Sequence, residues 1–240
     1  MKRLATTAVV AAFNEERTIG EVLAALSSSP LIDEIIVVSD GSTDRTVDIA
    51  RRFEGVKTIA LKENCGKGYA MRVGVDYARN DILFFVDGDM GNLTDETLES
   101  LILPVLRDQC DMNIGVRHRG PVLDFFHLKM QCGPVLSGIR VMKREVFETV
   151  PSQYMERFKI EAALNCFCSR YGYRQQHTVI YDLSHVIKET KRGLSDGLVS
   201  RWHMSREVFL LLFDLYVFET WRWTAPPKEE PAVDFDLFDE

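Results

Sequence analysis

Short apolar runs alternate with amphipathic segments through the first ninety residues of the chain. Between the first two runs, apolar residues recur at helical spacing, at Ile19, Val22, Leu23 and Leu26, and Asn14 stands where a helix would begin. The whole pattern predicts strands at 7–12, 34–39, 56–60 and 82–86, with helices after 14, at 44–53 and at 68–78. Apolar strands that alternate with amphipathic helices imply an α/β fold, a mostly parallel sheet flanked by helices.

The second half of the chain is less regular. It predicts helices at 94–106, 158–171 and 195–221 and strands at 112–116 and 174–181, with an irregular stretch that ends near 138. A Thr-Ala-Pro-Pro segment then ends the last helix. We therefore divide the chain into a main domain over 1–193, a C-terminal amphipathic helix within 194–224 and an acidic, disordered tail over 225–240.

Composition narrows the classes of partner. The formal net charge is −7 over 240 residues, and the last thirteen residues, with six acids and one lysine, carry most of it. The body is therefore near neutral, which argues against nucleic acid as the partner, because that binding needs many phosphate contacts from a basic face. Five cysteines, an odd number without paired CxxC spacing, predict reduced thiols and neither a disulfide framework nor a zinc ribbon. We see no export signal and no apolar stretch long enough to span a bilayer, so we expect a cytoplasmic protein.

The residues that follow the predicted strands are unusually polar. In a parallel sheet, ligands bind beyond the carboxyl ends of the strands. Asp87 and Asp89 flank Gly88 after the fourth strand, so two carboxylates converge where the backbone can approach a ligand. Carboxylate oxygens suit hard divalent cations such as Mg²⁺, and an ordinary acidic turn is the alternative.

A second polar segment, Asn64-Cys65-Gly66-Lys67-Gly68, stands where the third helix begins. Backbone N–H groups, the helix dipole and the lysine all favour an anion there, although a glycine-rich loop with a solvated lysine has the same sequence. The segment is not a P-loop, and a GxGxxG dinucleotide fingerprint is absent. Arg117 and Arg119 follow another predicted strand and could bind phosphate, or could simply be solvated.

These segments, in this order, resemble the family 2 glycosyltransferases of the GT-A fold over roughly residues 6 to 190. Residues 10–16 (VAAFNEE), 38–44 (VSDGSTD), 64–68 (NCGKG) and 86–90 (VDGDM) resemble four motifs of that family, the last being its D-x-D motif. Ala11 and Ser39 depart from the usual proline and aspartate. Further along, 137–145 (SGIRVMKRE) and 158–161 (FKIE) are similar to segments of dolichol-phosphate mannosyltransferase-like enzymes.

The resemblance implies a metal-dependent hexosyltransferase that uses a UDP- or GDP-linked sugar, with residues 1–193 as the catalytic domain. It implies a divalent cation, Mg²⁺ or Mn²⁺, at Asp87, Asp89 and His185, with Asp89 as a catalytic residue; a capping or surface role is the alternative for His185. Lys67 and Arg117 would contact the donor phosphates, and Arg140 would be a further phosphate contact at the catalytic centre. The implied donor site comprises Ala12, Phe13, Asn14, Glu15, Asp40, Lys67, Asp87, Gly88 and Arg117.

The proton chemistry depends on the acceptor. A phosphate or carboxylate acceptor is already ionised and needs no strong base, and no obvious base motif is present. Glu161 is the best candidate base should the acceptor be a hydroxyl. The alternative is that Glu161 orients Arg140 or Lys143.

The acceptor itself stays open at this stage. The apolar, aromatic stretch 209–218 could lie in a membrane interface, and 122–130 is a second apolar segment near the expected acceptor side. Together they favour a lipid acceptor, polyprenyl phosphate, with the protein peripheral on the inner face of the membrane. The stretch 209–218 could instead pack on its own domain or form a homodimer contact. An acceptor of the glucosyl-3-phosphoglycerate synthase type, small and anionic, would be held by Arg117, Arg119 and Lys188. A catalytically silent nucleotide-sugar-binding module is the rival outside the enzymes.

Overall fold

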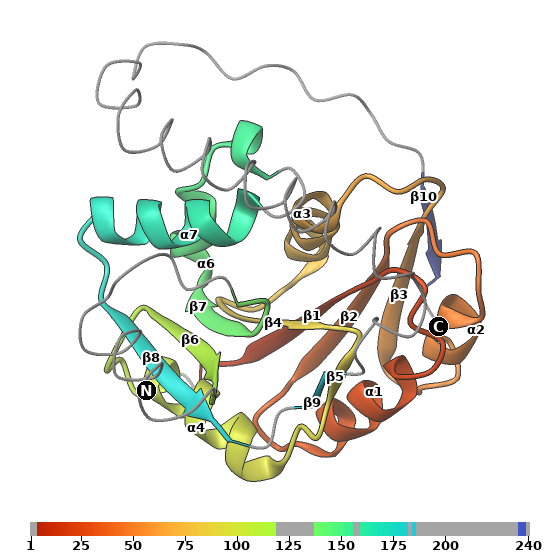
Figure 1. Ribbon diagram of the computed structural model, residues 1–240, viewed down its shortest axis with the longest axis horizontal. Helices are drawn as coiled ribbons and strands as arrows, with labels where there is room; N and C mark the ends of the chain where they lie inside the picture. The colour runs from red at the N-terminus through yellow and green to blue at the C-terminus, as the bar shows by residue number, and fades with distance from the viewer. Residues whose placement is uncertain (1–3, 119–136, 156–158, 182–183, 186–234, 239–240) are drawn as a thin grey trace, which may run out of the picture.

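The computed structural model describes residues 4–118, 137–155, 159–181, 184–185 and 235–238. Helices and strands alternate over the first half, as the sequence predicts (Figure 1). The helices are α1 (Ile19–Ser28), α2 (Thr46–Ala50), α3 (Lys67–Tyr77), α4 (Asp95–Leu106), α6 (Arg144–Glu148) and α7 (Lys159–Arg170), with a 3₁₀ turn at Ser152–Tyr154. The strands are β1 (Thr6–Ala12), β2 (Glu34–Ser39), β3 (Val56–Leu61), β4 (Ile82–Asp87), β5 (Met90–Gly91), β6 (Met112–Arg117), β7 (Arg140–Lys143), β8 (Gln175–Ile180), β9 (Ser184–His185) and β10 (Phe235–Phe238).

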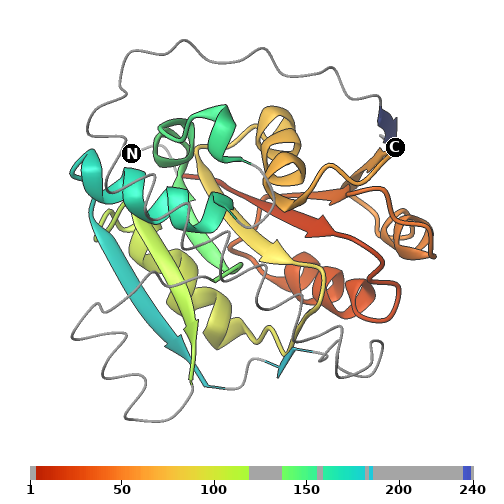
Figure 2. The same ribbon diagram turned by 45° about the horizontal axis from the view of Figure 1, so that its top comes forward.

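Eight of the strands form one sheet, in the order β10-β3-β2-β1-β4-β7-β6-β8. Strands β7 and β10 run antiparallel to their neighbours, and the other pairings are parallel. Figure 2 shows β6 and β8 side by side toward one edge and β10 at the other. The predicted α/β class with a mostly parallel sheet is therefore confirmed.

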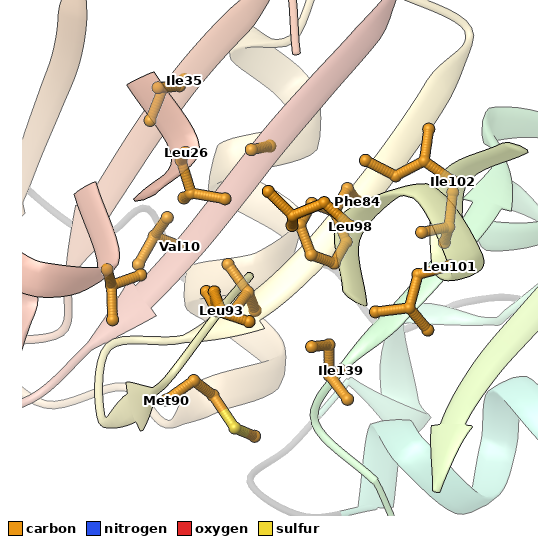
Figure 3. Packing of buried hydrophobic residues seen from close by; sticks show 14 of the residues in the cluster. Val10, Leu26, Ile35, Phe84, Met90, Leu93, Leu98, Leu101, Ile102 and Ile139 are labelled. Atoms are coloured by element: carbon orange, nitrogen blue, oxygen red, sulfur yellow. The ribbon is translucent and has the colours of Figure 1, made fainter. Parts of the chain in front are cut away.

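Side chains alternate between two layers along each central strand. Val10 and Phe84 face α1 and α4, where Leu26, Leu98 and Leu101 complete a buried cluster (Figure 3). Their neighbours in the sequence point to the other face, where α3, α6 and α7 pack. Burial on both faces explains why the strands read as unbroken apolar runs.

Three local expectations from the sequence are wrong. Helix α1 begins at Ile19 with Thr18 as its N-cap, because Asn14 has a positive φ of 57° and belongs to a turn. Strand β7 and helix α6 lie in residues 140–148, where no element was predicted, because a four-residue strand that starts with arginine carries almost no apolar signal.

The third correction concerns the C-terminal tail. We predicted disorder over 225–240 from its acidic composition, but Phe235–Phe238 form β10 and pair antiparallel with β3. The open edge of β3 supplies the backbone partners that composition alone cannot reveal. The expected helix at 194–224 lies outside the described residues, so the division of the chain there stays a prediction. In the part of the chain that the structure describes, no helix is long and apolar enough to cross a membrane.

Candidate active site

The loops after β1 and β2 are tied together by reciprocal hydrogen bonds. The Asn14 N–H donates to Ser42 Oγ (3.0 Å), and the Thr43 N–H donates to Asn14 Oδ1 (2.8 Å). The Glu15 N–H donates to Thr46 Oγ1 at 2.8 Å. These bonds bring the predicted donor-site segment 12–15 and the loop 40–44, which begins with the predicted donor-site residue Asp40, into one wall at the carboxyl ends of the strands. At its rim the ring of Phe13 is 44% exposed, as a ring that stacks on a ligand would need to be.

Asp40 connects this wall to the polar segment at residues 64–68. Its carboxylate is buried and accepts hydrogen bonds from the backbone N–H groups of Cys65 (2.7 Å) and Gly66 (2.9 Å). Burial raises the pKa of Asp40, and these two donors oppose that rise. The structure thus gives Asp40 a supporting role, holding the loop that begins α3, and its place in the donor site stays a prediction.

The Asp87-Gly88-Asp89 turn is fixed against the start of α1. The Gly88 N–H donates to the carbonyl of Ala11 (3.1 Å), and the buried Thr18 hydroxyl donates to the carbonyl of Gly88 (2.8 Å). A Cβ on Gly88 would stand 3.0 Å from the Cβ of Ala12, so this turn packs directly on the end of β1. Thr18 has no place in the sequence motifs, and only its position before a helix could have drawn attention to it.

His185 comes close to this turn through the backbone. Strand β9 pairs antiparallel with β5, and His185 stands opposite Met90, the residue directly after Asp89. The pairing links two segments almost a hundred residues apart, in the manner that a shared metal site would require. The side chain of His185 lies outside the described part of the structure, so its predicted metal contact stays a prediction.

Lys67 lies between two carboxylates from opposite sides of the site. Its Nζ is 2.7 Å from Oδ1 of Asp87 and 2.7 Å from Oε1 of Glu161. The side chains of Lys67, Asp87 and Glu161 are 19%, 25% and 10% exposed. Burial opposes the charge on Lys67, but the two carboxylates outweigh it and raise the pKa of Lys67 above its ordinary value. The lysine is therefore a fixed cation at the carboxyl ends of the central strands.

The carboxylate of Glu161 pairs with Lys67. Glu161 therefore does not orient Lys143, which pairs with Asp108 and Asp111. Burial alone would raise the pKa of Glu161, but the charges of Lys67 and Arg140 hold it below the ordinary value. A carboxylate held in this way is a weak base, which speaks against the predicted base role.

Arg140 lies behind the site. Its side chain is fully buried, and its guanidinium donates to the carbonyl of Ser137 (2.6 and 3.1 Å), to the carbonyl of Glu161 (3.3 Å) and to Asn165 Oδ1 (3.3 Å). The expected phosphate contact by Arg140 is therefore wrong, because its donors are engaged inside the protein. It fixes the start of α7 against the loop before β7.

The remaining predicted residues divide between the rim and the undescribed segments. Arg117 ends β6 with an exposed side chain at the carboxyl edge, where a phosphate could reach it. Arg119, Lys188 and the stretches 122–130 and 209–218 lie outside the described residues.

The side chains available as metal ligands fit a hard divalent cation only in part. Within the described residues no group of three or more histidine, cysteine, aspartate or glutamate side chains could hold a metal ion. Two carboxylates, those of Asp87 and Asp89, flank the turn, and they are the oxygen ligands that Mg²⁺ and Mn²⁺ take together with substrate phosphates. A nucleotide diphosphate and His185 would complete such a site.

A family model decides the class of this protein. The model of glycosyl transferase family 2 matches residues 7–175, well over half of the chain. The chain belongs to glycosyl transferase family 2.

Two curated enzymes are similar to part of this family 2 chain. Dodecaprenyl-phosphate galacturonate synthase of Rhizobium johnstonii is 34% identical over 126 residues, which cover 49% of this chain and 37% of that protein. The 4,4'-diaponeurosporenoate glycosyltransferase of Staphylococcus haemolyticus is 35% identical over 106 residues, which cover 42% of this chain and 28% of that protein. The matches thus span less than half the length of these curated relatives.

A solved structure extends the likeness along most of the chain. Glucosyl-3-phosphoglycerate synthase from Mycobacterium tuberculosis, in complex with Mn²⁺, UDP-glucose and glycerol 3-phosphate, superposes with a TM-score of 0.71 at 25% identity, over 88% of this chain and 80% of that one. The same enzyme has also been crystallised with Mg²⁺ and UDP. Together with the sheet order, this likeness confirms the GT-A fold that the sequence motifs implied.

Proposed function

We propose that this family 2 protein is a divalent-cation-dependent glycosyltransferase that moves a sugar from a UDP- or GDP-linked donor to a phosphate-bearing acceptor. The observation that carries the proposal is the convergence of four separate segments at the carboxyl ends of the parallel strands. The wall made by residues 12–15 and 40–44, the Asp87-Gly88-Asp89 turn and Lys67 are joined there by hydrogen bonds and ion pairs. The wall suits a nucleoside, Lys67 suits a diphosphate and the Asp87-Gly88-Asp89 turn suits a cation.

Each part has a chemical task. The ring of Phe13 and the wall around Asn14 offer a surface for the nucleoside, and the missing side chain of Gly88 lets the aspartate turn pack against Ala12 beside that wall. The ammonium of Lys67 carries three N–H donors, two of which go to Asp87 and Glu161, so the third can meet a phosphate oxygen. Mg²⁺ or Mn²⁺, when held by Asp89 with Asp87 and His185, would neutralise the charge that develops on the departing diphosphate.

An acceptor phosphate agrees with the state of Glu161. A phosphate oxygen is already ionised, so the transfer needs no strong base, and Glu161 is bound to Lys67. We choose polyprenyl phosphate as the acceptor, with the protein peripheral at the inner face of the membrane through residues 209–218. The name of the Rhizobium johnstonii relative, which includes dodecaprenyl phosphate, supports this choice.

A small anionic acceptor is the second candidate. The structural neighbour has been solved with glycerol 3-phosphate and with phosphoglyceric acid, and the exposed Arg117 could hold such an anion. Flotation with vesicles that contain polyprenyl phosphate separates the two acceptors. The lipid acceptor requires vesicle binding that is lost when residues 209–218 are made polar; a protein that transfers sugar but never floats takes the small acceptor.

Binding of the donor is tested by a thermal-shift panel. UDP- and GDP-linked sugars are each added with Mn²⁺, with Mg²⁺ and with EDTA, to wild type, to Asp89→Ala and to Glu99→Ala as a control on the exposed face of α4. A ligand at about a hundred times its Kd stabilises the native state by about 2.7 kcal/mol. For a chain of this size that is a rise in Tm of roughly 5–10 °C.

We expect this rise with one donor and a metal, in wild type and Glu99→Ala but not in Asp89→Ala. Equal shifts in Asp89→Ala and wild type would remove the metal assignment. A folded protein that responds to no donor would leave only an α/β domain without a donor site.

A further inference from the structure

One lysine is shared by two carboxylates that come from different layers of the fold. Asp87 ends β4 at the edge of the sheet, and Glu161 stands in the first turn of α7. Both are 2.7 Å from Nζ of Lys67, the first residue of α3. Helices α3 and α7 lie on the same face of the sheet (Figure 1). The ion pairs therefore join a strand and two helices at the point where the donor phosphates are expected.

The two carboxylates differ in how firmly they are held. The residue Glu161 as a whole is 7% exposed. Its backbone carbonyl accepts a hydrogen bond from the buried guanidinium of Arg140, which also donates to Ser137 and Asn165. Asp87, by contrast, stands at the rim, with a quarter of its side chain exposed. Of the two partners of Lys67, Glu161 is the one that a ligand in the site cannot easily reach.

We propose that Glu161 is a positioning residue: it keeps the Lys67 ammonium at the donor site when Asp87 turns toward the incoming cation and diphosphate. The inference rests on the proposed function and assigns Glu161 a task within it. A lysine has a long flexible stem, and with Asp87 as its only partner it would compete with the cation for that carboxylate. The second carboxylate, buried and anchored by Arg140, removes this conflict, because the ammonium stays paired while its third N–H faces the phosphates.

Positioning and base catalysis by Glu161 have different consequences. A positioning residue acts through Lys67, so its loss weakens nucleotide binding, and it matters only while Lys67 is present. A base touches the acceptor, so its loss lowers turnover and leaves nucleotide binding intact. The two roles are therefore separated by the affinity for the nucleotide and by its dependence on Lys67.

The test is a double-mutant cycle on nucleotide affinity. Binding of UDP and of GDP in the presence of Mn²⁺ is measured by calorimetry for wild type, Glu161→Gln, Lys67→Ala and the double variant. We expect Glu161→Gln to weaken binding about tenfold or more, the usual size of a lost charge-assisted contact to an anion. The double variant should bind no more weakly than Lys67→Ala, since the two residues act as one unit.

A matched control and a conservative variant complete the design. Asp111→Asn removes a similarly enclosed carboxylate, paired with Lys143 and Arg174 at the other end of the sheet, and should leave the nucleotide Kd unchanged. Glu161→Asp keeps the charge and should bind more tightly than Glu161→Gln; if the glutamine variant does not fold, the cycle is run with Glu161→Asp.

Three results would overturn the inference. If Glu161→Gln binds nucleotide as wild type does but loses turnover, Glu161 is a base. If the losses of the single variants add in the double variant, Glu161 does not act through Lys67. If wild type binds neither nucleotide, the proposed donor site falls and the inference falls with it.

Discussion

At the scale of single residues, the side chains of the site have partners that lie far away along the chain. Lys67 and Glu161 are 94 residues apart, and the two N–H groups that Asp40 binds are 25 and 26 residues away from it. Many of these contacts leave little spare room. Substitutions that add or remove one small group should therefore affect ligand binding.

Gly138 offers the clearest example of such a position. A Cβ there would clash with the carboxylate of Asp87 and the ammonium of Lys67, which are the mobile ends of their side chains. We expect Gly138→Ala to displace that ion pair and weaken nucleotide binding about tenfold or more, while changing stability by less than about 1 kcal/mol, because the displaced groups can move toward solvent. Calorimetry with UDP and Mn²⁺, beside urea unfolding, measures both; a large loss of stability with normal binding would contradict this account.

Sequence motifs pointed to these residues but not to all of their contacts. The two aspartates around Gly88, Lys67 and the segment 12–15 were all predicted, because each follows an apolar strand at the edge where ligands bind. The enclosed position of Arg140 and the partner of Glu161 could not be predicted. Both depend on how β7 and α7 pack behind the site, and the pattern of residues in one sequence does not reveal which of these two elements' side chains meet.

At the scale of elements, the start of α1 supports the aspartate turn. The hydroxyl of Thr18, the N-cap residue, donates to the carbonyl of Gly88 and so ties the first helix to the end of β4. In the part of the chain that the structure describes, the long apolar strands and amphipathic helices were predicted within a few residues of their bounds. Strands β7 and β10 were not, because short strands are selected by the neighbours that accept them, here β4, β6 and β3.

Replacing Thr18 with valine tests that tie. Valine keeps the shape of threonine but cannot donate, so the buried carbonyl of Gly88 loses a partner, at a cost of about 1–3 kcal/mol. We expect a lower free energy of unfolding together with weaker Mn²⁺-dependent binding of the nucleotide, since the turn that carries Asp89 would be less well held. Thr97→Val, on α4, is the control for a lost threonine hydroxyl elsewhere. Wild-type affinity in Thr18→Val would show that the turn holds its shape without this bond.

At the scale of the whole molecule, charged clusters occupy both ends of the sheet. The proposed donor site lies at the carboxyl ends of the parallel strands. At the opposite end, the carboxylate of Asp111, before β6, accepts from Lys143 at 2.7 Å and from Arg174 at 2.9 and 3.0 Å. This second cluster joins β6, β7 and the start of β8, so it contributes to stability and stands apart from the proposed chemistry.

The cluster gives a pH dependence with a defined sign. Hydrogen bonds from Arg174, against the opposing effect of burial and with help from Lys143, hold the pKa of Asp111 well below its usual range. A lowered pKa means that the stabilisation is fully present above the unfolded value of about 3.9 and is lost as the pH falls below it. We expect Asp111→Asn to cost roughly 1–2 kcal/mol at pH 7, since Arg174 is half exposed and water screens the pair.

Urea unfolding of wild type and Asp111→Asn at a series of pH values measures this difference. The gap between the two proteins should close as the pH falls from 5 toward 2. A gap that stays constant over this range would mean that the charge of Asp111 contributes nothing to folding.

The most direct test of the donor site is diffraction from crystals grown with Mn²⁺ and UDP, recorded at the manganese absorption edge. We expect one anomalous peak within coordination distance of the Asp89 carboxylate, with the diphosphate of UDP beside it and the uracil against the wall formed by residues 12–15 and 40–44. Manganese and nucleotide bound at another place, or a nucleotide against this wall with no metal near Asp89, would contradict the account.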